Sequence, residues 1–363
     1  MQVHQFHPTV AYGDAISNQI LSLQDLLRDM GYRSEIFCEQ LPIQFEGRAQ
    51  QIRRYARHSS PRNVLLLHFS LGYSPDVITW LSQLTDQKVI VYHNITPHTY
   101  FAGINDIYLE AAKAGREQLG LLSNLVDAGW GDSTFNCQEL VEHGWSKVGV
   151  LPIIFDPQRY AVRPDRGVLK RWQDGLNVLF VGRVSPNKCL EDLILTFYYL
   201  RRFVRSDAHL LLVGSAKGME IYLEFLKTLV KRLSLPGVVF TGHVSNAELM
   251  AYYRSADVYL SMSEHEGFGV PFLESMYFDV PVIAYKAAAV PETLNGSGFL
   301  VKERDYPAVA GLIALLAEDE DLRALVIDRQ RKRLRDFMPE RIRDRLQDLL
   351  HDIQTEERKT GSA

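Results

Sequence analysis

The sequence has few cysteines, no long apolar run and no excess of positive charge. Its 363 residues include 3 cysteines, Cys38, Cys137 and Cys189, which lie far apart and show no metal-ligand spacing. Separated thiols in an odd number do not form a disulfide framework, so we expect a reducing compartment. Because metal sites need clustered ligands, we expect no bound metal.

Long apolar segments are missing as well. No run approaches the roughly 18 residues that a membrane-spanning helix requires. The first ten residues, MQVHQFHPTV, have neither a basic start nor a long apolar stretch, so we expect no signal peptide. These absences predict a cytoplasmic protein, which leaves open a peripheral contact at the inner face of the plasma membrane.

Positive charge is not in surplus, because 40 Lys and Arg stand against 44 Asp and Glu, a formal net charge of −4. Binding to a phosphate backbone rewards a large cationic excess, so we expect no nucleic-acid partner. The composition is otherwise ordinary, with 46% apolar and 23% charged residues, which favours a globular fold. The length suits two domains better than one.

Short apolar runs alternate with longer amphipathic ones along the chain. This rhythm is typical of β-α units around parallel sheets. The clearest expected helix is 14–30, where apolar residues keep a 3.6 period and Gly31 follows as a stop. The expected strands are 2–6, 34–38, 63–68, 88–93, 147–150, 176–182, 208–214, 237–242, 256–263 and 280–285.

A proline-rich stretch interrupts the rhythm at 151–168, LPIIFDPQRYAVRPDRGV, and predicts a linker. The predicted fold class is therefore α/β, with two doubly wound, Rossmann-like domains facing each other across a cleft. The expected boundaries are 1–155 and 156–338, followed by a final amphipathic helix and tail at 339–363. Ligands of such sheets bind beyond the carboxyl ends of the strands, which directs attention to the loops there.

One such loop lies in SEHEGFGVPFLES, residues 263–275, directly after an expected strand. Gly267 and Gly269 allow close backbone approach, and with the following helix N-terminus they form an anion site suited to a diphosphate. Carboxylates only accept hydrogen bonds, so Glu266 and Glu274 are expected to bind hydroxyl groups. An acidic first helical turn, favoured by the helix dipole, is the alternative interpretation.

A second loop, in VLFVGRVSPNKCLEDLI, places Arg183 and Lys188 between a strand end and a helix start. Arg can grip phosphate in a bidentate way and Lys acts as a point charge, so together they can neutralise a diphosphate. The alternative is a pair of solvated loop cations.

The first half offers three weaker candidates. His93 ends an expected strand in KVIVYHN, where a structural and a functional role stay equally open. His68 has the same topological place but a more buried setting, which favours a structural role. Gly13 turns the chain before the first helix, where Asp14 is a helix cap, and can let its loop close over a bound ligand.

Taken together, these motifs resemble the retaining glycosyltransferases of family 4, which have the GT-B fold. The resemblance covers nearly the whole chain and is strongest over 176–301. Its most specific element is a pair of glutamates separated by seven residues, Glu266 and Glu274 within EHEGFGVPFLE, supported by FVGRVSPNK and VFTGHVSNAELMAYYRSADVYLSMS. The chain departs from the family at Cys189, where the family usually has glycine. It departs again at Ala287 to Ala289, where many relatives have glycines, which leaves donor preference open.

The resemblance implies roles for the residues of the second domain, the donor-binding one. Arg183 and Lys188 would hold the donor diphosphate, Glu274 the ribose hydroxyls and Glu266 the transferred sugar. The remaining implied donor contacts are Gly267, Phe268 and Gly269 at the sugar and phosphates, and His243 and Val244 by the base.

In the first domain, which would take the acceptor, the resemblance places His93 near the O6 of the sugar and Gly13 in a glycine loop. The final helix would cross back to this domain. Catalysis would thus rest on His93, Glu266, Arg183 and Lys188.

The activity implied is that of a retaining hexosyltransferase. A hexose would move from a nucleotide diphosphate sugar to a hydroxyl of a glycan or lipid-linked acceptor in surface polysaccharide assembly. The stretches YHNITP and GDAISNQI resemble mannosyltransferases, so GDP-mannose is the expected donor and a UDP-sugar the alternative. We expect a metal-independent front-face mechanism and no cofactor, since the sugar nucleotide is a substrate and GDP or UDP a product.

Other functions stay open on the same scaffold. A nucleotide-sugar epimerase would share the donor site. A sugar-binding protein of the periplasmic kind fits the absence of a signal peptide poorly, and a nicotinamide oxidoreductase lacks its G-x-G-x-x-G after the first strand. The segment 46–60, EGRAQQIRRYARHSS, predicts a helix with four arginines, Arg48, Arg53, Arg54 and Arg57. It is either a solvated basic face or a contact for an anionic membrane or lipid-diphosphate acceptor.

Overall fold

The computed structural model describes the backbone of residues 1–11 and 13–360 and the side chains up to residue 354. The chain forms two compact units, each built around one parallel sheet. Unit 1 comprises residues 1–98, 110–156 and 337–363, and unit 2 comprises 99–109 and 157–336. The last three residues of the expected tail lie outside the described residues.

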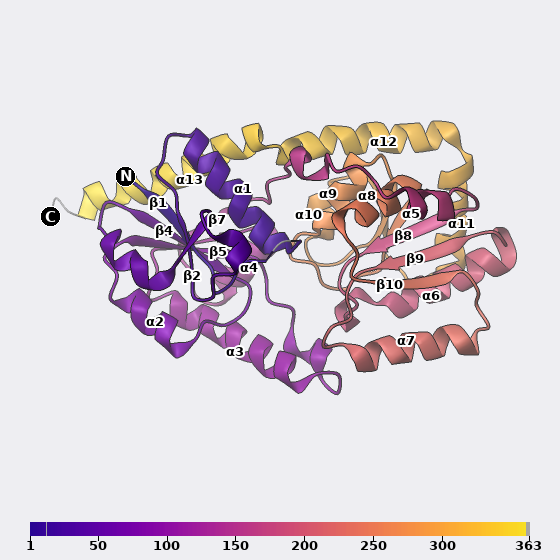
Figure 1. Cartoon of the computed structure of the whole chain (residues 1–363), viewed down its shortest axis with the longest axis horizontal. Helices are drawn as coiled ribbons and strands as arrows, with labels where there is room; N and C mark the ends of the chain where they lie inside the picture. Colours follow the sequence, from indigo (N-terminus) through magenta and orange to yellow (C-terminus); the bar gives the residue numbers. More distant parts are fainter. Residues whose placement is uncertain (12, 361–363) are drawn as a thin grey trace. The chain divides into compact units, whose positions relative to one another are not determined.

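Unit 1 contains a sheet with the strand order β3-β2-β1-β4-β5-β6-β7. Its strands are β1 Val3–Phe6, β2 Ile36–Cys38, β3 Ala49–Gln51, β4 Val64–Phe69, β5 Gln87–Tyr92, β6 Ala128–Gly131 and β7 Val148–Val150. Its helices are α1 Ala15–Asp29, α2 Pro75–Ser82, most of α3 Asp106–Leu122, α4 Thr134–Glu142 and α13 Pro339–Thr360. Figure 1 shows α1 and α13 on one side of this sheet and α2 and α3 on the other.

Local signals account for much of unit 1. Asp14 caps α1 by accepting from the backbone N–H of Ser17 at 2.8 Å. β4, an almost wholly apolar run, is buried along its whole length, as a central parallel strand should be. Helix α13 packs its apolar residues onto the same face as α1, and a side chain on Gly149 of β7 would collide with Leu349 of this helix.

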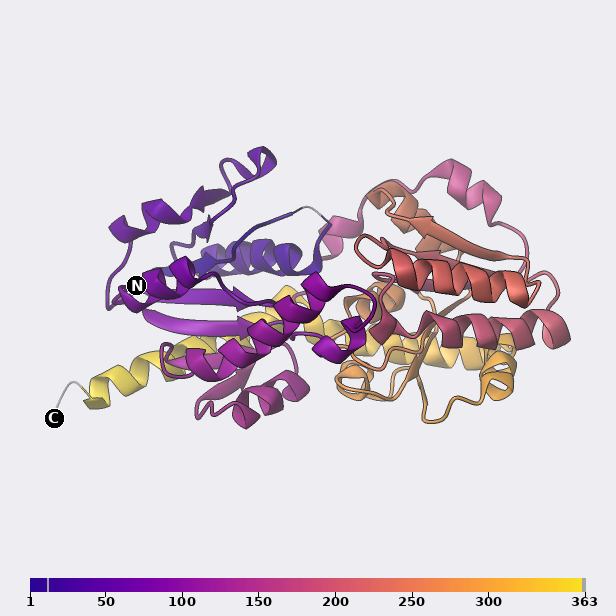
Figure 2. The ribbon, with the colours of Figure 1, turned by 90° about the horizontal axis from the view of Figure 1, so that it is seen from below.

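Unit 2 has the strand order β10-β9-β8-β11-β12-β13. Its strands are β8 Asn177–Val181, β9 His209–Val213, β10 Val238–Gly242, β11 Val258–Ser261, β12 Val282–Tyr285 and β13 Phe299–Val301. Its helices are α5 Arg166–Arg171, α6 Leu190–Tyr199, α7 Glu220–Arg232, α8 Asn246–Ser255, α9 Val270–Tyr277, α10 Val290–Leu294, α11 Tyr306–Glu318 and α12 Glu320–Leu334. Helices α6 and α7 lie on the side of this sheet that is seen from below in Figure 2.

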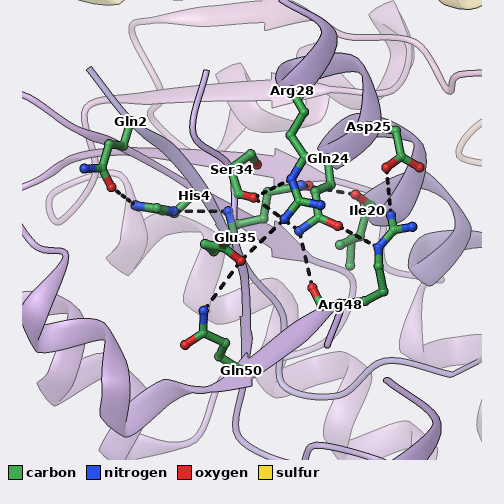
Figure 3. Close-up of polar contacts among 11 residues, drawn as sticks. Gln2, His4, Ile20, Gln24, Asp25, Arg28, Ser34, Glu35, Arg48 and Gln50 are labelled. Carbon is green, nitrogen blue, oxygen red and sulfur yellow. Dashed lines mark hydrogen bonds and ion pairs between the residues drawn. The ribbon is translucent and has the colours of Figure 1, made fainter. Parts of the chain in front are cut away.

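The basic segment 46–60 is not the helix that its composition suggests. Residues 49–51 extend the sheet as edge strand β3, and Ile52–Arg57 form a short 3-10 helix. Arg48 is fixed on α1, where its Nη2 lies 2.9 Å from Asp25 Oδ1 and its Nε donates to Gln24 Oε1 at 3.0 Å (Figure 3). The helix prediction was wrong because pairing of 49–51 with β2 outweighs local helix propensity.

Candidate functional site

The sheet of unit 2 has a switch point between its neighbouring strands β8 and β11. Strands β9 and β10 lie on one side of β8, and β12 and β13 lie on the other side of β11. Parallel sheets bind ligands where the strand order reverses in this way, outside the carboxyl ends. The loops after β8 and β11 are therefore the candidate site, and both carry residues that the sequence singled out.

Lys188 and Glu266 meet at this switch point. Lys188 ends the short 3-10 helix Pro186–Lys188 after β8, and Glu266 lies in the loop after β11. Lys188 Nζ is 2.7 Å from Glu266 Oε2, and the two side chains are 18% and 14% exposed. A cation and an acid are thus held together, close to solvent, where a ligand can reach both.

A buried asparagine joins the two loops. The side-chain amide of Asn187 donates to the backbone carbonyl of His265 at 3.1 Å. The backbone carbonyl of Asn187 accepts from the N–H of Glu264 at 3.0 Å. These bonds fix the loop after β8 against the loop after β11. Sequence reasoning missed Asn187, because its position next to Lys188 gave no sign of a partner in another loop.

Cys189 takes a left-handed backbone conformation, with φ 48° and ψ 50°, between the 3-10 helix and α6. A residue with a side chain costs about 1–2 kcal/mol there, which explains why glycine is usual in the family that the motif resembles. Burial, with the nearby acids Glu264, Glu191 and Asp192, raises the pKa of this thiol to about 12. The thiol therefore stays protonated and is no nucleophile.

The alanines at 287–289 show the same feature. Ala288 has φ 47°, so this loop also retains a left-handed residue where many relatives have glycine. The loop is held in place by the Ala289 N–H, which donates to the carbonyl of Glu266 at 3.2 Å. Both departures from the family pattern therefore keep a backbone shape that glycine adopts more readily.

Glu274 projects from α9 into a buried setting and does not contact Lys188 or Glu266. Its carboxylate accepts from the hydroxyl of Tyr160 at 2.9 Å and from that of Tyr253 at 2.5 Å. Burial raises the pKa of Glu274, against the opposing effect of these two hydroxyls. A carboxylate has about four acceptor positions, so further hydroxyls can still bind. Neither tyrosine was predicted, because both are distant from Glu274 in the sequence.

The glycine loop between the two glutamates is tightly fixed. Gly269 has φ 94°, and a Cβ on it would lie 2.4 Å from the ring of Phe272. The carbonyl of Phe268 accepts from the hydroxyl of Thr293 at 2.6 Å. Gly267, Phe268 and Gly269 thus form a rigid turn that leads into α9.

Arg183 lies after β8, as expected, and its contacts are with Tyr108 and Lys217. Its guanidinium is stacked 4.3 Å from the ring centre of Tyr108, and its Nη2 donates to the carbonyl of Lys217 at 3.3 Å. His243 and Val244 follow β10, where His243 is exposed and Val244 half-buried. Neither contacts the Lys188–Glu266 pair, and the adjacent Ser245 begins α8 with a capping box.

His93 of unit 1 is buried at the carboxyl end of β5, with a side chain only 2% exposed. Its Nδ1 is 2.9 Å from Asp132 Oδ2, and its Nε2 is 2.8 Å from Nδ1 of His68. His68 Nε2 is in turn 2.9 Å from Gln5 Oε1. Both ring nitrogens of His93 are thus engaged within the unit. Gly13, with φ 80°, lies in the turn before α1.

Two absences in the described part of the chain bear on the site. Among the side chains of residues 1–11 and 13–354, no group of three or more His, Cys, Asp or Glu could hold a metal ion. None of the helices described is long and apolar enough to cross a membrane.

Residues 164–333 match the family described as glycosyl transferases group 1. O-antigen chain mannosyltransferase B of Escherichia coli is 28% identical over 152 residues, which cover 42% of this chain and 39% of that protein. A GDP-mannose-dependent alpha-(1-6)-phosphatidylinositol monomannoside mannosyltransferase of Mycobacterium tuberculosis is 33% identical over 187 residues, 47% of each chain. The chain thus spans less than half the length of these curated relatives.

Solved structures resemble the chain over nearly its whole length. Anabaena HepE, in complex with UDP and glucose, has a TM-score of 0.72 at 16% identity and covers 97% of this chain and 100% of its own. Sucrose-phosphate synthase from Thermosynechococcus elongatus has a TM-score of 0.75 at 17% identity, over 98% of this chain and 100% of its own. The predicted fold class is confirmed, because the chain has the GT-B fold. Residues 164–333, the greater part of unit 2, are similar to the glycosyl transferases group 1.

Proposed function

We propose that the chain is a glycosyltransferase whose nucleotide-sugar donor binds at the switch point between β8 and β11. The observation that carries this proposal is the Lys188–Glu266 pair, with its charged atoms 2.7 Å apart. A donor offers a diphosphate to the cation and sugar hydroxyls to the acid. It can therefore replace each partner of the pair with a ligand contact.

GDP-mannose is the proposed donor and mannose the proposed transferred hexose. Support comes from the Mycobacterium tuberculosis relative, which is named as GDP-mannose-dependent, and from the Escherichia coli relative, named as a mannosyltransferase. A UDP-sugar is the second candidate, because Anabaena HepE, of the same fold, was solved in complex with UDP-glucose.

The proposed reaction retains the configuration at the anomeric carbon. The acceptor hydroxyl attacks from the face on which the diphosphate leaves, through an oxocarbenium-like state, and its proton passes to the departing diphosphate. Lys188, Arg183 and the N-terminus of α9 stabilise the charge of that leaving group, a role that needs no metal. Glu266 orients the sugar and Glu274 the ribose. His93 and Gly13 are the proposed contributions of unit 1, beside the sugar and the diphosphate.

The proposed acceptor is a glycan or a lipid-linked sugar. Arg53, Arg54 and Arg57 are exposed, and none forms an ion pair in the part of the chain that the structure describes. They are the proposed contact for an anionic lipid surface, with a solvated basic face as the alternative. Co-sedimentation with phosphatidylglycerol vesicles should exceed that with phosphatidylcholine vesicles, and equal binding would remove the membrane contact.

The test of the proposed activity replaces Lys188. Release of GDP from GDP-mannose, or of UDP from UDP-glucose, is measured with and without a lipid-linked sugar acceptor. Loss of one preorganised charge at a leaving group typically lowers kcat about 10²–10³-fold, which is the effect expected for Lys188→Ala. Lys227→Ala, at an exposed ion pair on α7, is the matched control and should keep the full rate.

An unchanged rate in Lys188→Ala would overturn the proposed mechanism. Analysis of the products formed without acceptor distinguishes a transferase from an epimerase, the remaining alternative. An epimerase would convert the nucleotide sugar into an isomer and release no nucleoside diphosphate, whereas a transferase needs the acceptor for turnover.

A further inference from the structure

A short segment from the first half of the chain is part of unit 2. Residues 99–109, between β5 and the body of α3, cluster with unit 2, although the residues on both sides belong to unit 1. The hydroxyl of Tyr100 donates to Glu264 in the loop after β11 at 3.1 Å. The side chain of Asn105 donates to the carbonyl of Gly218, in the loop after β9, at 2.8 Å. The segment is therefore attached to two loops at the carboxyl end of this sheet.

Tyr108 of the same segment lies against Arg183. The guanidinium carbon is 4.3 Å from the centre of the tyrosine ring, a cation–π contact. Asn105 fixes the ring from the backbone side, since its Oδ1 accepts from the Tyr108 N–H at 3.0 Å. Arg183 is thus held between an aromatic surface and the carbonyl of Lys217.

The loop after β9 is shaped to admit this ring. Gly218 has φ 78°, and a Cβ there would lie 2.7 Å from Cε2 of Tyr108 and 3.3 Å from Nδ2 of Asn105. No side chain larger than hydrogen fits without displacing the tyrosine. The contact between Tyr108 and Arg183 is therefore built into the backbone of the loop rather than made by two mobile side chains.

An acid competes for the same cation. Glu220 accepts from the N–H of Gly218 at 2.9 Å. The pKa of this carboxyl is lowered by the backbone N–H groups of Gly218 and Glu220 and also by the charge of Arg183. Glu220 thus lies within electrostatic reach of Arg183, yet the two form no ion pair, and the guanidinium stacks on Tyr108 instead.

We propose that Tyr108 is a positioning residue for Arg183. The ring holds the guanidinium stacked on its face, prevents it from pairing with Glu220, and leaves it available to bind the donor diphosphate. The inference rests on the proposed function, because a nucleoside diphosphate donor gives Arg183 its partner. It makes a residue from the first half of the chain a determinant of donor affinity in unit 2.

The test is a double-mutant cycle read by calorimetric binding of GDP and UDP, with guanosine and uridine measured by competition. Tyr108→Leu should weaken binding of the preferred diphosphate about three- to tenfold, in line with a cation–π contact. Tyr108→Phe should keep wild-type affinity, and neither variant should change nucleoside affinity. In an Arg183→Ala background, Tyr108→Leu should have no further effect.

Two more variants test the same proposal if the Tyr108→Leu protein does not fold. Gly218→Ala should displace the ring and reproduce the selective loss of diphosphate affinity. Glu220→Gln should restore part of that affinity in the Tyr108→Leu or Gly218→Ala protein, since it removes the competing acid.

The outcomes separate the inference from the proposed function. Tyr108→Leu could weaken diphosphate and nucleoside binding equally, or could keep its full effect in the Arg183→Ala background. Either result would overturn the role of Tyr108 and leave the proposed donor site intact. Wild-type diphosphate affinity in Tyr108→Leu, together with weakened diphosphate affinity in Arg183→Ala, would also overturn the role of Tyr108. A wild-type protein that binds neither GDP nor UDP would overturn the donor site, and this inference with it.

Discussion

The two sheets share a strand arrangement but differ in what they hold at the carboxyl ends of their central strands. In unit 1 the polar groups there, from Gln5 through His68 and His93 to Asp132, are 0–3% exposed and bonded to one another. In unit 2 the Lys188–Glu266 pair is 14–18% exposed and held by loops. The same topology therefore supports a closed polar chain in one unit and an accessible charged pair in the other.

The hydrogen bonds of the polar chain in unit 1 determine which of its side chains donate. The Gln5 amide nitrogen donates to the carbonyl of Ile20 at 3.1 Å, so its oxygen must accept from His68. Burial, with the charge of neighbouring His93, holds the pKa of His68 well below its usual value, so His68 is neutral and accepts from His93. His93 Nε2 then donates to His68, and its Nδ1 faces Asp132 Oδ2 at 2.9 Å. His7, near both rings, and Asp14, near His7, are the other ionisable groups that influence this chain.

The comparison shows why burial alone does not identify a binding site. Breaking the chain of unit 1 leaves an uncompensated buried charge, so its groups contribute to stability. The pair in unit 2 can exchange its partners for ligand groups with water nearby. Ligand binding on this fold is expected at the accessible pair of unit 2, while the buried chain links strands of the sheet in unit 1.

Asp132→Ala should have the largest effect on stability. Removing one partner of a buried charged pair typically costs about 3–5 kcal/mol, and Nδ1 of His93 would lose the carboxylate of Asp132. Denaturant unfolding should show this loss, while GDP binding at unit 2 below the transition should be unchanged. Asp29→Ala, at an exposed position at the end of α1, is the control. An Asp132→Ala protein that keeps its stability but loses GDP binding would contradict the division of roles between the two units.

Gly269→Ala should destabilise unit 2 by about 1–3 kcal/mol, because alanine at φ 94° is strained and its Cβ meets the ring of Phe272. Gly311→Ala is a matched control in α11, where the added Cβ meets nothing within 4 Å. It should stabilise by up to about 1 kcal/mol. Thermal unfolding of both variants tests whether the glycine loop is rigid. Equal shifts in unfolding temperature for Gly269→Ala and Gly311→Ala would disprove this rigidity.

Glu274→Gln should stabilise the ligand-free protein by about 0.5–2 kcal/mol at neutral pH, at the expense of donor binding. Burial raises the pKa of Glu274, so the folded protein holds this proton more tightly than the unfolded chain. The contribution of Glu274 to stability is therefore fully present below its unfolded pKa and is lost as pH rises through its folded pKa. The variant should lack that loss, and parallel pH profiles of thermal unfolding would contradict the prediction.

Cys189→Gly should have the smallest effect. Relief of the left-handed strain at φ 48° is offset by the entropy of glycine and by the loss of a buried side chain. Stability should change by less than about 1 kcal/mol, and donor affinity should stay the same. A large gain in affinity would show that the thiol obstructs the approach of α6 to phosphate.

Sequence reasoning reached those parts of the fold whose signals are local. The apolar runs of β4 and β8 and the Asp14 cap all depend on neighbours in the chain. It missed β6, AGWG, because glycine disfavours strands in general. The structure explains the exception: side chains at Gly129 and Gly131 would collide with Leu140 and Asn136 of α4.

The sequence predicted the loops of the candidate site but not the residues that hold its side chains in place. The loops with Lys188 and Glu266 could be expected to meet, because the ends of neighbouring parallel strands share one edge. The partners that hold the other residues could not. Tyr160 and Tyr253 on Glu274, and Tyr108 on Arg183, approach from distant segments, and a lone tyrosine carries no spacing signal.

The most direct test of the account is thermal unfolding with GDP, UDP, ADP and dTDP at millimolar concentration, for the wild type and Lys188→Ala. A ligand at about 100 times its Kd adds roughly 2.7 kcal/mol of stability, a readily measured shift. We expect the largest shift with GDP, and we expect Lys188→Ala to lose that shift. No shift with any of the four nucleotides would contradict the donor site at the Lys188–Glu266 pair.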